Sequence, residues 1–192
     1  MKKLLVSILS LLMTMTFLFS AAIADTTDDN ASYQAIYDMI LEEMDSVEIT
    51  YDRYDDYFSI YFGYELDDAN YGDAMVFMSA YSDAFTITAG FTTAIKSENF
   101  SEVLSFINLL NGDLYVGKLM LDKSDDDWYL TYEVFVSVDP DNIDDWDRSA
   151  LLGYTDLSLD IICELSDYIA EIEAGETGAN VYAMYLADYM SE

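Results

Sequence analysis

The spacing of apolar residues changes twice along this chain, and that change restricts the fold more than any other feature. Residues 31–45 carry apolar side chains every three or four positions, which is the spacing of one helix face. Between residues 46 and 92 the apolar side chains recur every second position instead, which is typical of half-buried strands. The first half therefore predicts a helix followed by an antiparallel meander of three or four strands.

Helical spacing returns between Asn99 and Gly112, where Asn99 is placed to cap a helix and Gly112 to stop it. Two more strands, over residues 114–121 and 128–138, flank the acidic turn 123–127 and predict a hairpin. The expected core face of the middle helix consists of Phe100, Val103, Leu104, Ile107 and Leu110.

A long helical region is predicted over residues 143–174, with Gly153 and Thr155 as candidate interruptions, and a short helix follows over 181–189. Cys163 is the only cysteine, which excludes an internal disulfide, and its apolar neighbours predict a buried, inert thiol. The expected apolar set of the long helix is Trp146, Leu151, Tyr154, Leu157, Ile161, Ile162, Leu165, Tyr168, Ile169 and Ile172.

These elements predict an α+β domain in which helices pack on one face of an antiparallel sheet. The expected order is helix, three or four strands, helix, two strands and helix, with a short C-terminal helix added. The domain is expected over residues 31–174, and residues 175–192 form a C-terminal extension.

The N-terminus has the pattern of an export signal. Lys2 and Lys3 precede an apolar run over residues 4–19, and residues 22–24 read Ala-Ile-Ala, as a signal peptidase requires. We expect residues 1–24 to be a cleaved signal peptide, with a retained N-terminal anchor as the alternative. The mature protein is then periplasmic or extracellular, with disorder over residues 25–30 and in the last few residues.

The chain is strongly acidic, with 38 acidic and 7 basic residues and a net charge of −31. Losing the two lysines of residues 1–24 leaves five basic residues and a net charge of −33. Such a charge repels nucleic acid and anionic membranes, so we expect neither as a partner. It attracts basic surfaces, although life in salt or the demands of solubility are alternative reasons for it.

The usual catalytic groups are missing from the sequence. The chain has no histidine, which excludes Ser-His-Asp and Cys-His systems and ordinary zinc sites. There is no glycine-rich phosphate loop. A glycan hydrolase that uses only carboxylates remains a remote alternative, because among 38 acidic residues some pair meets the required spacing by chance. We therefore expect no enzyme and assign no catalytic, cofactor-binding or metal-ligating residue.

Calcium is the more serious chemical alternative, because oxygen-rich loops suit hard cations. None of the acidic loops has the spacing of an EF-hand, and a calcium-responsive acidic domain stays a second hypothesis. The three candidate loops are Asp67, Asp68, Asn70 and Asp73; Asp125, Asp126 and Asp127; and Asp139, Asp141, Asn142, Asp144 and Asp145.

Tyrosines are concentrated between residues 51 and 71. Alternation assigns Phe58, Ile60 and Phe62 to the core and leaves Tyr57 and Tyr61 on the outer face of a strand. With Asp55 and Asp56 beside them, these two tyrosines form a candidate surface for a partner that carries Arg or Lys. The alternative is that they only decorate the outer face of the sheet.

Three segments of the second half resemble one known family. Residues 106–111 (FINLLN) end the middle helix, residues 117–122 (GKLMLD) begin the hairpin, and residues 128–138 complete it. With the order of elements, they resemble the YbjN family, whose fold is like that of type III secretion chaperones. The resemblance covers about residues 31–172. It implies a protein-interaction or chaperone-like role without a cofactor, and it supplies no catalytic residues.

These observations lead to one functional hypothesis. We expect an exported, non-enzymatic interaction module, chaperone-like or regulatory, that engages a basic or partly unfolded protein. Nothing in the sequence identifies that partner or decides whether the domain forms a homodimer.

Overall fold

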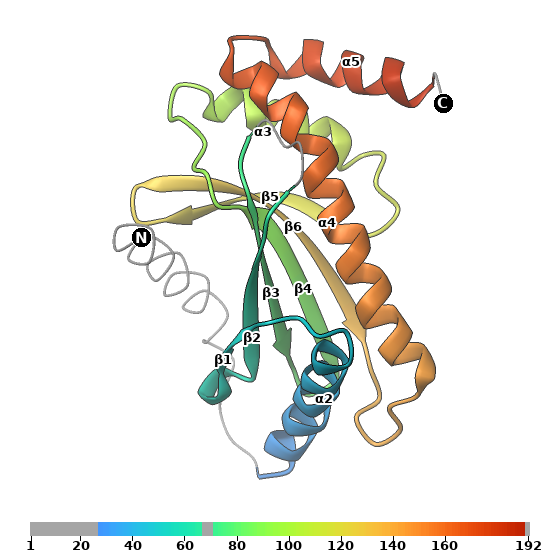
Figure 1. The fold of residues 1–192 in the computed structure, drawn as a ribbon. Coiled ribbons are helices and arrows are strands. Elements are labelled where there is room, and N and C mark those ends of the chain that lie inside the picture. Colours follow the sequence, from blue (N-terminus) through green and yellow to red (C-terminus); the bar gives the residue numbers. More distant parts are fainter. Residues whose placement is uncertain (1–26, 67–70, 191–192) are drawn as a thin grey trace.

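The structure is a computed structural model, and it describes residues 27–66 and 71–190 (Figure 1). The expected signal peptide therefore lies outside the described residues. The elements are α2 (Thr27–Ser46), β1 (Asp52–Tyr54), the 3-10 helix η2 (Asp55–Tyr57), β2 (Ser59–Tyr64), β3 (Ala74–Ala80), β4 (Ala84–Phe91), α3 (Phe100–Leu110), β5 (Lys118–Ser124), β6 (Asp127–Ser137), α4 (Asp145–Glu173) and α5 (Gly178–Tyr189).

The six strands form one antiparallel sheet in the order β1-β2-β3-β4-β6-β5. The first four strands are a meander, as the alternation predicts. Helix α3 then connects β4 to the β5–β6 hairpin, and β6 rather than β5 pairs with β4. The middle of the sheet is therefore β3, β4 and β6, while β1 and β5 are its two edges.

One face of the sheet is the core. The register brings Ile60, Met78, Ile87 and Val134 into one row across four strands, and each is at most 1% exposed. Helix α2 packs against β3, and α4 packs against β4 and β6 (Figure 1). The predicted α+β architecture, with helices packed against an antiparallel sheet, is confirmed.

Helix α4 is continuous over 29 residues, and neither Gly153 nor Thr155 interrupts it. Its start is secured by a capping box. The Asp144 carboxylate accepts the backbone N–H groups of Trp146 and Asp147, and the Asp147 side chain accepts the Asp144 N–H at 3.0 Å. This long helix crosses the sheet and reaches α3 and α5 at the end of the molecule where those two helices lie (Figure 1).

Helix α5 is docked on α3. The Gly178 N–H donates to the Glu102 carboxylate at 2.9 Å, and Val181 is fully buried. A side chain at position 178 would overlap the α3 backbone at Glu102 and Phe106, so glycine is needed for this close approach. The Tyr182 hydroxyl donates to the Asp113 carboxylate just beyond α3. The helix begins three residues before the predicted start at Val181.

The N-terminal boundaries differ from the predicted ones. Helix α2 begins at Thr27, so its first residues fall within the stretch 25–30 for which disorder is expected. The alternating residues 47–51 are not a strand. Glu48 has a φ of 57° just after the helix, and β1 begins only at Asp52. Val47 and Glu48 instead form a turn, so the alternation of apolar residues in the sequence does not correspond to a strand here.

Three residues expected in the core lie at the surface. Leu104 is 37% exposed, Trp146 is 61% exposed, and Cys163 is exposed. In each case the neighbouring residue occupies the helix face that packs: Val103, Asp147 and Ile162 are buried instead. A run of adjacent apolar residues on a helix cannot all face one side, because consecutive side chains point about 100° apart.

The hairpin turn is tighter than predicted. Strands β5 and β6 continue to the pair Ser124–Asp127, which leaves only Asp125 and Asp126 in the turn. Asp125 has a φ of 54°, a conformation that aspartate tolerates better than most residues.

In the described part of the chain, no helix is both long and apolar enough to span a bilayer.

Candidate functional site

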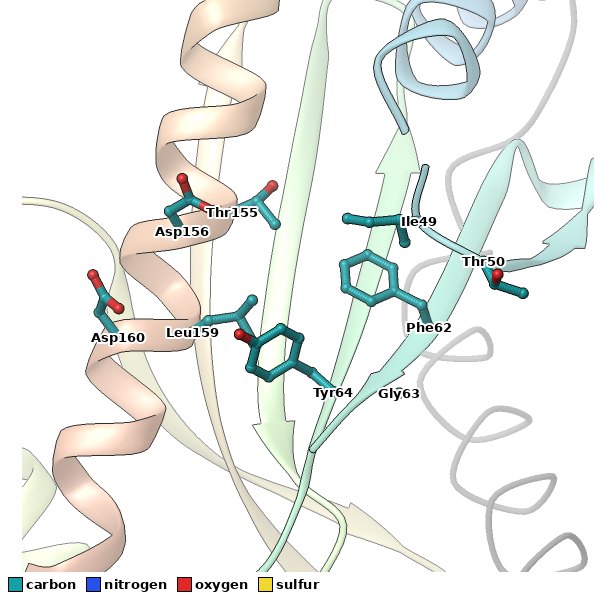
Figure 2. Close-up of a pocket in the computed structure, with 9 residues that line it drawn as sticks. All are labelled: Ile49, Thr50, Phe62, Gly63, Tyr64, Thr155, Asp156, Leu159 and Asp160. Carbon is teal, nitrogen blue, oxygen red and sulfur yellow. The ribbon is translucent and has the colours of Figure 1, made fainter. Parts of the chain in front are cut away.

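A groove of about 550 Å³ lies on the helix-covered side of the molecule, between α4, the end of β2 and the segment that joins α2 to β1 (Figure 2). Its volume is within the range of ligand-binding clefts. It is lined by Ile49, Thr50, Phe62, Gly63, Tyr64, Thr155, Asp156, Leu159 and Asp160.

Local structure explains how these residues meet. The turn at Glu48 ends α2, and the Ile49 N–H donates to the Met44 carbonyl at 3.2 Å, which holds residues 49–50 near the helix end. The capped, continuous α4 presents Leu159 from the opposite side.

The floor of the groove is apolar. Phe62 is 3% exposed, and Figure 2 shows its ring beside Ile49. Leu159 reaches from α4 toward the ring of Tyr64, which is 48% exposed. An incoming aliphatic side chain can therefore lose water against four apolar side chains, at about 25 cal/mol for each Å² buried.

The rim of the groove on the α4 side is acidic. Asp156 and Asp160 are exposed and one helical turn apart, and the described residues that line the groove include no Lys or Arg. Two like charges at this spacing weaken a helix by a few tenths of a kcal/mol. The Thr155 hydroxyl, by contrast, is used internally, because it donates to the Leu151 carbonyl at 2.7 Å.

The described lining of the groove suits binding through apolar and charge contacts. It holds two carboxylates, and it has no imidazole, amine or thiol beside its hydroxyl groups. The two carboxylates lie side by side on one helix, whereas a glycosidase places its pair on opposite sides of the scissile bond. The groove is therefore suited to hold an apolar group with a positive charge beside it.

The predicted tyrosine surface is not formed as expected. Tyr57 is in η2, not in a strand, and is 51% exposed. Tyr61 is in β2, where its ring stacks on Tyr54 at 5.3 Å and on Phe77 at 5.8 Å. Tyr57 is not among its ring partners, because the left-handed conformation of Phe58 breaks the alternation between η2 and β2.

Asp55, expected beside that surface, is exposed but is bonded to residues of its own chain. Its carboxylate accepts hydrogen bonds from the Tyr37 hydroxyl at 2.8 Å and from Arg53 Nε at 2.9 Å. The bond from Tyr37 and that from Arg53 hold the pKa of Asp55 below its ordinary value. Burial, with the adjacent carboxylate, raises the pKa of Tyr37 to about 12.

The candidate calcium loops find little support. Asp67, Asp68 and Asn70 lie outside the described residues. Among the residues that are described, no three acidic, Cys or His side chains are grouped to hold a metal ion. In the third loop Asp144 caps α4, and the Asp139 carboxylate accepts the Asp141 N–H at 3.1 Å. These carboxylates thus stabilise a turn and a helix start.

The segments that resemble the YbjN family have structural roles. The Asn111 side chain accepts the Leu119 N–H at 2.7 Å and donates to the Leu119 carbonyl at 2.9 Å, so it pairs with β5 as a neighbouring strand would. Gly117 has a φ of +68° and lies against the ring of Tyr132, whose hydroxyl donates to the Val116 carbonyl at 2.6 Å. These contacts join α3 to the hairpin.

Comparisons with known proteins agree with the resemblance to the YbjN family. No curated protein sequence matches the chain. Among the solved structures to which the fold is similar is one described as "Crystal structure of YbjN, a putative transcription regulator from E. coli", with a TM-score of 0.53 and 13% sequence identity. That likeness covers 68% of this chain and 87% of the other, and at this identity it shows the fold alone.

A family model described as "Putative bacterial sensory transduction regulator" matches residues 37–152, which is more than half of the chain. The match includes α2 from Tyr37, the whole sheet and α3, and it ends within α4. Asp156, Asp160 and α5 lie beyond it. The chain belongs to the YbjN family.

Proposed function

We propose that this protein is an exported, non-enzymatic interaction module, regulatory or chaperone-like, that binds a basic segment of a partner protein in the groove. The observation that carries the proposal is the apolar floor beside Asp156 and Asp160, with no basic side chain among the described lining residues. Lys and Arg suit such a place because their apolar stems pack on the floor while their charges reach the carboxylates.

The net charge of the whole chain also favours a basic partner protein. A net charge of −31 draws a basic protein toward the surface and raises the rate of encounter. The same charge disfavours nucleic acid. The family description, a sensory transduction regulator, is consistent with a protein that acts by binding.

A labelled peptide tests the binding. The probe is a twelve-residue peptide of three Lys-Ser-Leu-Ser repeats, and fluorescence anisotropy measures its affinity for the purified protein. We expect binding that weakens with salt, and weaker binding when Glu replaces Lys or Ser replaces Leu. Equal affinity for all three peptides, or no binding, contradicts the proposed function.

Paired variants assign that binding to the groove. Asp156→Asn with Asp160→Asn should weaken binding about three- to tenfold, as expected for two exposed charge pairs. The control is Asp167→Asn with Glu171→Gln, which changes the same charge on the same helix away from the groove lining. An equal loss in both double variants would show that only the total charge matters.

Export is tested separately. Mass spectrometry of the protein recovered from the periplasm or the medium should find an N-terminus at Asp25. A protein that keeps residues 1–24, or that stays in the cytoplasm, contradicts export and leaves the groove proposal standing.

A further inference from the structure

Strand β1 covers only part of the outer edge of β2. Their pairing stops at Asp52 and Tyr61, whereas β2 continues to Tyr64 with β3 on its other side. Residues 49–51, which precede β1, do not extend the ladder along the remaining edge, since its last pair is Asp52 with Tyr61. Among the described residues, 27–66 and 71–190, a short length of strand edge is therefore unpaired where β2 lines the groove.

The direction of the backbone groups follows from the hydrogen bonding of the meander. The Ala80 N–H donates to the Phe58 carbonyl at 2.9 Å, so Phe58 and every second residue after it direct their backbone groups to β3. The residues between them face the outer edge, and beyond β1 the one that does so is Gly63. Within residues 27–66 and 71–190, no backbone hydrogen bond joins Gly63 to Thr50, the residue that a longer β1 would place opposite.

Gly63 has no steric reason to be glycine. A Cβ atom built there would meet nothing within 4 Å. A small side chain at this position would therefore not obstruct a neighbouring strand. The outward-facing backbone of Gly63 is the feature that fits an incoming strand.

Resting on the proposed function, we propose that the partner segment binds in an extended conformation, as a strand added to β2 at Gly63. One residue of the segment exchanges backbone hydrogen bonds with Gly63. The residues before and after it then face the same side as Phe62 and Tyr64, which is the side of the groove. The recognised pattern is thus one basic and one apolar residue separated by a single residue, with the charge near Asp156 and Asp160.

A helical partner would not use this edge. A helix satisfies its own backbone groups and gains no hydrogen bond from Gly63. Added strands, in contrast, obtain affinity from main-chain hydrogen bonds and specificity from alternate side chains. The open edge therefore favours the extended segment over a basic amphipathic helix.

N-methylation of the Lys-Ser-Leu-Ser peptide tests the inference on the unaltered protein. In an added strand Lys and Leu face the groove, and the intervening Ser residues direct their N–H groups to Gly63. N-methyl groups on Ser should weaken binding about tenfold or more, because a hydrogen bond is lost and the methyl group separates the strands. N-methyl groups on Leu should change binding less than threefold.

Two variants at one position complete the test. Gly63→Pro removes the outward N–H and should weaken binding about tenfold, whereas Gly63→Ala keeps the N–H, places its Cβ in open space and should bind normally. Circular dichroism checks that both variants fold, and if Gly63→Pro does not, the methylated peptides still decide. Binding that is insensitive to both N-methyl patterns overturns the added strand alone, whereas no binding of the unmethylated peptide overturns the proposed function.

Discussion

The hydroxyl of Tyr37, a residue only 1% exposed, donates a 2.8 Å hydrogen bond to Asp55 and so ties α2 to the turn before β2. Arg53 completes the arrangement, because it bonds to Asp55 and lies over the Tyr37 ring at 5.7 Å. Phe58 packs edge-on against the same ring at 5.9 Å. This contact sets the position of β2, and therefore of the groove that β2 lines.

Tyr37→Phe should lower the melting temperature by roughly 2–4 °C, because one hydrogen bond of about 1 kcal/mol is lost in a domain of this size. Tyr57→Phe is the matched control, since Tyr57 is 51% exposed and its hydroxyl should contribute nothing measurable. Thermal denaturation followed by circular dichroism compares them. Equal melting temperatures of the two variants would contradict the role of Tyr37.

The raised pKa of the Tyr37 hydroxyl predicts that the stability difference between the unaltered protein and Tyr37→Phe changes at alkaline pH. The pKa of Tyr37 is raised from 10.0 to about 12 in the folded protein, so its contribution to stability is complete below pH 10 and is lost as pH rises through 12. The free energy of unfolding of the unaltered protein should therefore approach that of Tyr37→Phe over this interval. Urea denaturation at several pH values measures it, and a constant gap between the two proteins would refute the prediction.

At acid pH, the lowered pKa of Asp55 predicts that stability falls as pH falls, which is opposite to the effect of Tyr37 at alkaline pH. Because its pKa is lowered in the folded state, its contribution to stability is present above the ordinary value of 3.8 and is lost as pH falls below that value. Asp55→Asn should thus be less stable than the unaltered protein at pH 6, and the gap should close toward pH 2. Urea midpoints at both pH values give the answer, and a gap that persists in acid would argue against it.

Asn111→Ala should destabilise the protein by about 1–3 kcal/mol, because the Leu119 N–H and carbonyl both lose their side-chain partner. Asn108→Ala is the control, since Asn108 is exposed on the same helix. Hydrogen exchange of the Leu119 amide reports the bond directly. Unchanged protection of that amide in Asn111→Ala would show that the pairing does not form in solution.

Two glycines predict effects of opposite sign. Gly117→Ala should destabilise strongly, because position 117 has a φ of +68° and a side chain there would overlap the Tyr132 ring. Gly153→Ala should stabilise α4 by about 0.5–1 kcal/mol, because a Cβ at position 153 meets nothing within 4 Å. Chemical denaturation of the two variants measures both, and a loss of stability in Gly153→Ala would mean that the exposed glycine has a role in the fold.

Much of the architecture could be predicted from local pattern. Residues 46–92, in which apolar side chains recur every second position, contain strands β2, β3 and β4, and the helical spacing over residues 99–112 corresponds to α3. The wrong predictions are those that depend on which distant segment a residue contacts, because local sequence pattern does not contain that information. Residues 47–51 alternate but have no neighbouring strand, and the apolar run at Ile162 and Cys163 does not reveal which of the two faces the core.

The candidate site was less predictable than the fold. Tyr57 and Tyr61 were proposed from alternation, and a left-handed residue between them separates their surfaces. Phe62 was assigned to the core and Leu159 was in none of the predicted sets. The two are 97 positions apart in the sequence, and only packing brings them to one groove. Asp156 and Asp160, one helical turn apart, could not be distinguished by sequence from the other acidic residues among the 38 in the chain.

The sequence by itself determined the class of fold, the order of its elements, the charge and the family, because periodicity, turn residues and short motifs are local properties of the chain. The tertiary structure alone decided that β6 lies between β4 and β5, that β1 stops short of Gly63, and that α4 brings two carboxylates to the open end of β2. These relationships depend on which distant surfaces pack together, and that depends on the free energy of the whole arrangement.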